Sequence, residues 1–94
     1  MREAVTLAPD VVLRVINGEA LLLKLGDEDV FALNDTGTRI VQLIAEGLDL
    51  NRVIDTLHQE YGVERSELQQ AVADLVAALL SRGLVVRTEG MPGE

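Results

Sequence analysis

The first third of the chain alternates short apolar runs with polar turns. Residues 11–16 (VVLRVI) are apolar in all but one position, and Asn17-Gly18 follows at once. Asn-Gly between apolar runs is the strongest short hairpin signal, because both residues tolerate the positive φ of a type I′ turn. We therefore predict that residues 19–25 (EALLLKL) return antiparallel to the first strand.

A second polar turn and a third apolar run extend this hairpin. Residues 26–29 (GDED) have turn composition, and residues 30–33 (VFAL) are uncharged and follow without a break. Strands joined by tight turns pair with their sequence neighbours. The first third of the chain is therefore predicted to be a three-stranded antiparallel meander whose third strand lies at an edge.

The hydrophobic period changes from strand-like to helical after residue 33. Apolar residues now recur three and four positions apart, with Asp35 or Thr36 in position to cap the first helix. The predicted helices span residues 37–46, 50–61 and 65–82, and each is followed by a glycine that can end it: Gly47, Gly62 and Gly83. Residues 84–86 can add a short final strand, and residues 88–94 are expected to fray.

This order of elements predicts an α+β fold that is winged-helix-like, with an N-terminal three-stranded antiparallel β-sheet followed by a three-helix bundle. Ninety-four residues are enough for one small domain. We expect a single domain over residues 1–87 and a flexible C-terminal tail over residues 88–94.

The alternation of side chains also predicts which residues share a face. The sheet residues expected to face the helices are Leu21, Leu23, Leu25, Phe31 and Leu33. The opposite face would then be apolar apart from Arg14 and Lys24, with Val12, Ile16, Leu22 and Val30. Such a face is either a protein interface or a set of scattered surface apolar residues. The third helix is expected to bury Leu68, Val72, Leu75 and Leu79.

Charge and composition exclude several classes of function. The formal net charge is -8, and the eight basic residues are scattered, so nucleic acid and anionic membranes are unexpected partners. The absence of cysteine removes disulfides and thiolate chemistry and suits the cytoplasm. No apolar run has the length of a membrane span, and no residue spacing indicates a metal site or a bound cofactor.

Catalytic motifs are equally absent. His58 is the only histidine and is expected on a helix surface, without a cysteine to pair with. Asp35-Thr36-Gly37 matches the active-site triplet of aspartic proteases, but here it leads directly into a helix. One glycine without a lysine does not make a phosphate-binding loop. A winged-helix DNA-binding module stays open as an alternative, although its third helix would carry Glu67 and Asp74 between two end arginines.

Three segments together resemble the PqqD-like family of recognition elements for ribosomally made, post-translationally modified peptides. They are LNDTGTRIVQLIAEG at residues 33–47, a second helix that closes in Glu60-Tyr61 and continues to Val63, and Gly83-Leu84 after the third helix. The resemblance covers residues 5–87 and is greatest to the stand-alone leader-binding proteins of lasso peptide pathways.

The resemblance implies a non-catalytic protein that binds the N-terminal leader of a precursor peptide. It would deliver the precursor to a transglutaminase-like leader peptidase and an asparagine-synthetase-like cyclase. In such families the leader adds as a strand to the third β-strand, beside the third helix. Val41 replaces a tryptophan that is frequent in the family, while Ala71 and Leu75 replace a frequent aspartate and phenylalanine.

The residues themselves are compatible with such a groove. An edge strand without charge can accept a peptide strand, or it can simply be covered by its own third helix. Small residues along one flank of the third helix would leave room beside it, although alanine is also an ordinary helix former. The residues predicted to bind the leader are Asp29, Val30, Phe31, Ala32, Leu33, Glu67, Gln70, Ala71, Asp74, Leu75 and Ala78.

Overall fold

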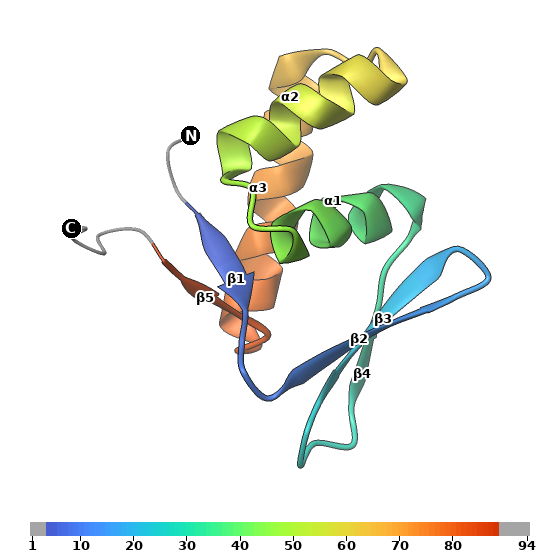
Figure 1. Cartoon of the computed structure of the whole chain (residues 1–94), viewed down its shortest axis with the longest axis vertical. Helices are drawn as coiled ribbons and strands as arrows, with labels where there is room; N and C mark the ends of the chain where they lie inside the picture. The colour runs from blue at the N-terminus through green and yellow to red at the C-terminus, as the bar shows by residue number, and fades with distance from the viewer. Residues whose placement is uncertain (1–3, 89–94) are drawn as a thin grey trace.

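The computed structural model describes residues 4–88. It has the predicted α+β fold, with a three-stranded antiparallel sheet and three helices (Figure 1). In chain order its elements are β1 (Val5–Leu7), β2 (Val11–Ile16), β3 (Glu19–Lys24), β4 (Val30–Ala32), α1 (Asp35–Ala45), α2 (Leu50–Tyr61), α3 (Arg65–Ser81) and β5 (Val85–Arg87).

The three-stranded sheet has the strand order β2-β3-β4. Asn17 and Gly18 have φ values of 54° and 81°, the positive φ that a type I′ hairpin turn requires. The resulting register places Leu13 opposite Leu22, and Leu22 opposite Phe31. Within residues 4–88, β4 therefore pairs on one side only, and the predicted edge strand is confirmed.

A second sheet was not predicted from the sequence. β1 pairs antiparallel with β5, and the Thr88 N–H extends this pairing by donating to the Ala4 carbonyl at 2.9 Å. Thr88, expected to fray, is thus held in place, while residues 89–94 lie outside the described residues. β1 has three residues, too few to show an alternating pattern. In Figure 1 this pair lies on the opposite side of the molecule from β4.

The prediction of which β3 residues face the helices was wrong. Ala20 and Leu22 are completely buried beneath the helices, whereas Leu21 and Leu23 lie on the other face and Leu25 is exposed. Three consecutive leucines carry no alternation, so either phase satisfied the pattern. Packing against the helices therefore selects the phase, and at Ala20 the backbone N–H also donates to the Thr38 hydroxyl of α1 at 2.8 Å.

Capping residues define where the helices begin. Asn34 caps α1 by accepting a hydrogen bond from the Gly37 N–H at 2.8 Å, so the prediction of Asp35 or Thr36 as the cap was wrong by one or two positions. Both of those residues lie inside the first helical turn. Asp49 caps α2 in the same way, and Gly62 ends it in the left-handed conformation with φ 69°.

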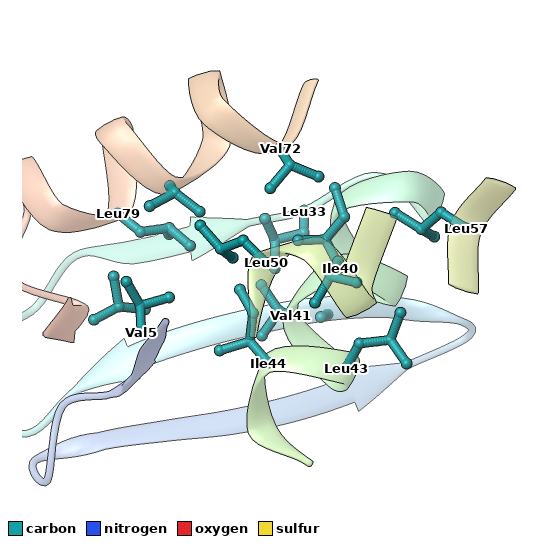
Figure 2. Close-up of a cluster of buried hydrophobic side chains, with 14 of the residues drawn as sticks. Val5, Leu33, Ile40, Val41, Leu43, Ile44, Leu50, Leu57, Val72 and Leu79 are labelled. Atoms are coloured by element: carbon teal, nitrogen blue, oxygen red, sulfur yellow. The ribbon is translucent and has the colours of Figure 1, made fainter. Parts of the chain in front are cut away.

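The core lies between the helices and the inner face of the sheet. Figure 2 shows aliphatic side chains from α1, α2 and α3 meeting Leu33 and Val5. α3 buries Leu68, Val72, Val76 and Leu79, so Val76 occupies the place predicted for Leu75. Leu75 is half-buried at the margin of the core, where it lines a cleft.

Candidate peptide-binding groove

The free edge of β4 presents unpaired backbone groups. The Leu33 N–H donates to the Ala20 carbonyl at 2.9 Å, so the backbone groups of Leu33 point toward β3. Because successive residues of a strand point their backbone groups to opposite sides, those of Ala32 and Val30 point away from β3. Both residues are exposed. The strand therefore offers two N–H and two carbonyl groups to an added peptide strand.

A cleft of about 540 Å³ lies beside this edge, which we call the main cleft. It is lined by residues of β4, α1 and α3. Leu33 and Ile40 are buried where they line it, whereas Ala71 on α3 is exposed. Its lining residues are Phe31, Ala32, Leu33, Asn34, Thr36, Gly37, Ile40, Ala71, Asp74 and Leu75.

The beginning of α1 contributes residues that sequence reasoning missed. Asn34, Thr36, Gly37 and Ile40 all line the main cleft. A Cβ atom at Gly37 would lie 3.1 Å from Leu33 Cδ2 and 3.2 Å from Asn34 Oδ1, so glycine lets the helix start pack closely on the strand. Their position directly after the edge strand is the signal that could have identified them.

One charged side chain lines the main cleft. The Asp74 carboxylate accepts a hydrogen bond at 2.9 Å from Gln70 Nε2, one turn earlier on α3. This contact restricts the carboxylate at the margin of an otherwise mostly apolar surface. A side chain with an apolar stem and a hydrogen-bond donor near its end would match both parts of the wall.

A smaller pocket of about 160 Å³ adjoins the same strand on the other side of Phe31; we call it the side pocket. The Phe31 ring lines both spaces, and the Arg82 guanidinium lies over it, 5.1 Å from the ring centroid. The residues lining the side pocket are Leu22, Lys24, Asp27, Asp29, Val30, Phe31, Arg82 and Leu84.

The structure brings most of the predicted leader-binding residues together. Phe31, Ala32, Leu33, Ala71, Asp74 and Leu75 line the main cleft, and Asp29 and Val30 line the side pocket. Gln70 contacts Asp74 at the rim. Glu67 and Ala78 line neither space. Their placement on the same helix follows the prediction, but the lining of the groove is centred on Ala71 and Leu75.

Between residues 4 and 88 there is no group of three or more His, Asp or Glu side chains that could hold a metal ion. The His58 Nδ1 lies 2.8 Å from the Val63 carbonyl oxygen, where it links the end of α2 to the following turn. In the same part of the chain, no helix is long and apolar enough to cross a membrane.

Comparisons with known proteins identify a family and two similar structures. The family model described as "Coenzyme PQQ synthesis protein D (PqqD)" matches residues 19–85. The structure of TbiB1 in complex with the TbiA(beta) leader peptide is similar, with a TM-score of 0.80 and 30% identity, over 90% of this chain and 95% of that one.

A second solved structure is similar to about the same degree. Lasso peptide synthetase B1 complexed with the leader peptide has a TM-score of 0.79 and 29% identity, over 87% of this chain and 96% of that one. No curated protein matches the sequence. Since the family model spans well over half of the sequence and the fold agrees with two leader-peptide complexes, the chain belongs to the PqqD family.

Proposed function

We propose that this protein binds the leader segment of a ribosomally made precursor peptide by strand addition to β4. The leader backbone pairs with the outward groups of Val30 and Ala32, and its side chains enter the space between β4 and α3. The observation that carries this proposal is the main cleft lying directly beside the one edge of β4 that has no strand partner within residues 4–88.

Side-chain burial has to supply most of the affinity. Each backbone hydrogen bond contributes about 1 kcal/mol net, whereas ordering each peptide residue costs about 1 to 2 kcal/mol. Backbone pairing alone therefore about breaks even. One or two leader side chains buried in the main cleft add about 1.5 to 3 kcal/mol each, which favours leaders with large apolar side chains.

The protein acts as a non-catalytic carrier in this proposal. It presents the bound precursor to a transglutaminase-like leader peptidase and an asparagine-synthetase-like cyclase of a lasso peptide pathway in the cytoplasm. Support comes from the likeness to lasso peptide synthetase B1. Reconstitution with such a peptidase tests this part: adding the protein should accelerate leader cleavage, and an unchanged rate would contradict the delivery role.

A titration with fluorescent TbiA(beta) leader peptide tests the binding itself. We expect saturable binding that Ala71→Trp weakens by about tenfold or more, because the indole fills the main cleft where a leader side chain would be buried. Ala77→Trp is the matched control, since Ala77 is an exposed alanine of the same helix outside the cleft. Circular dichroism verifies that both variants fold.

The outcome that contradicts the proposal is clear. Equal affinities for Ala71→Trp, Ala77→Trp and the unsubstituted protein would exclude the main cleft as the binding site. A mobility shift with duplex DNA, in the absence of leader binding, would instead support the winged-helix alternative.

A further inference from the structure

Two cationic side chains meet at the side pocket, next to the proposed leader groove. The Arg82 guanidinium lies over Phe31, and Lys24 lines the same pocket. The ammonium group of Lys24 lies against the backbone after α3, because a Cβ atom at Gly83 would be 2.9 Å from Lys24 Nζ. Two of only eight basic residues are thus gathered at one end of the groove.

Neither cation forms an ion pair with a carboxylate of the described chain. The ion pairs within residues 4–88 are Arg39–Glu60 and Arg65–Asp55, both away from this pocket. Asp27 and Asp29 line the pocket, but neither pairs with Lys24 or Arg82. In a protein with twice as many acidic as basic residues, two unpaired cations beside a peptide-binding edge favour an anionic group on the ligand.

The size of the side pocket limits what can enter it. Its volume of about 160 Å³ corresponds to about five water molecules at about 30 Å³ each. That space fits a carboxylate with a few waters beside the Phe31 ring. A guanidinium accepts a carboxylate in bidentate geometry, and Arg82 can do so while it remains stacked on Phe31.

From these observations we propose that the side pocket binds an aspartate or glutamate side chain of the leader, with Arg82 and Lys24 as the recognising groups. This inference rests on the proposed function. Alternate residues of an added strand point to the same side, and Phe31 lines both spaces. The acidic residue therefore lies on the same face of the leader as the side chain that fills the main cleft, an even number of positions away.

Asp29 opposes the two cations from the rim of the same pocket. It repels an incoming carboxylate and so lowers affinity for the acidic leader. Asp29→Asn should therefore raise the affinity, by about twofold to threefold for an exposed charge. An increase in affinity on removing a charge is a result that simple damage to the groove does not produce.

Selection from a random peptide library displayed on phage tests the inference without knowledge of the natural leader. Peptides that bind the unsubstituted protein should share an acidic residue at a fixed even spacing from an apolar one. Replacing that acid by its amide should weaken binding about tenfold. Arg82→Gln and Lys24→Gln should bind the acidic peptide more weakly and the amide peptide with little change, whereas Arg52→Gln, a distant exposed arginine, should match the unsubstituted protein.

The possible failures can be told apart. Selected peptides without an acidic position, or equal binding of the acid and amide peptides by the unsubstituted protein, would overturn the inference and leave leader binding intact. The absence of any selected peptide, together with no binding of the TbiA(beta) leader, would contradict the proposed function and the inference with it. The direction of the affinity change in Asp29→Asn is an independent test. A decrease in affinity would contradict binding of an acidic side chain in the side pocket.

Discussion

The three-stranded sheet has two outer strands, and they differ in length and in what lies beside them. β2 has six residues, including the exposed Val15 and Ile16, whereas β4 has three. By length alone β2 would be the better template for an added strand. Only β4 lies beside the main cleft, where α1 and α3 both provide side-chain contacts. The space of about 410 Å³ beside Val15 of β2 has no residue of α3, and its α1 residues are all polar or charged.

This difference shows what makes a strand edge a binding site. Backbone groups at any open edge can pair with a peptide, and pairing alone about offsets the ordering cost. Selectivity comes from the pockets that the neighbouring helices build for alternate side chains. The shorter strand is therefore the proposed site, and the longer one serves as its internal control.

Proline substitution in the two outer strands should give the largest difference in leader affinity. Ala32→Pro removes the outward N–H of β4 and places a ring at the edge, so we expect leader affinity to fall by about 2 to 3 kcal/mol, or about 100-fold. Val15→Pro makes the equivalent change on β2, where the alternation also directs the N–H outward.

A titration with the TbiA(beta) leader peptide measures both proline variants. Val15→Pro should keep the affinity of the unsubstituted protein. If the two prolines weaken binding equally, the leader does not distinguish the two strands and β4 is not the specific site.

Removal of the Thr38 hydroxyl should affect stability on the β4 side of the sheet. Thr38 is 5% exposed and accepts the Ala20 N–H. Thr38→Val leaves this buried donor unsatisfied, and we expect the free energy of unfolding to fall by about 1 to 3 kcal/mol in urea titrations. Thr56→Val is the control, because its hydroxyl donates at an exposed helix position. Equal losses for both variants would contradict this role.

The N-cap of α1, directly after β4, should make a smaller contribution to stability. Asn34→Ala removes the acceptor for the Gly37 N–H and should cost about 1 kcal/mol of unfolding free energy. Thr36→Ala should cost clearly less, since Thr36 is inside the helix and is not the cap. Thermal unfolding of both variants measures the difference, and the reverse order would show that Thr36 is the cap.

The smallest effect concerns an ion pair between α1 and α2. The hydrogen bonds from Arg39 hold the pKa of the Glu60 carboxyl below its usual value. Because the folded pKa is the lower one, the carboxylate stabilises the fold above the usual pKa of glutamate, and this contribution is lost as the pH falls through the lowered value. Glu60→Gln should flatten that part of the acid unfolding curve without changing leader affinity at neutral pH.

Most of the fold could be predicted from the sequence, because the signals for its turns and helix ends are local. Asn17-Gly18 specified the hairpin, and Gly62 specified the end of α2. The errors arose where a decision depended on distant residues. Leu21, Leu22 and Leu23 are equally apolar, and only packing against the helices, which buries Ala20 and Leu22, selects the phase. β1 acquires its strand conformation from pairing with β5, about eighty residues away.

For the candidate groove too, features encoded locally were predicted and features that depend on distant residues were missed. Val30–Ala32 could be recognised as an uncharged edge, and the resemblance to the PqqD family pointed to the third helix. The contribution of α1 was missed because Thr36 was interpreted only as a possible cap. The side pocket could not be predicted, since it brings Lys24 of β3 to the end of α3, a contact that no local pattern encodes.

The hydrogen bond between Thr88 and Ala4 has a practical consequence. The two ends of the described chain lie next to each other, on the side of the molecule away from β4 (Figure 1). A short linker could join them, and new termini could be opened in the turn at Gly47. Such a circular permutant would interrupt no strand or helix, because Gly47 lies between the end of α1 and the start of α2.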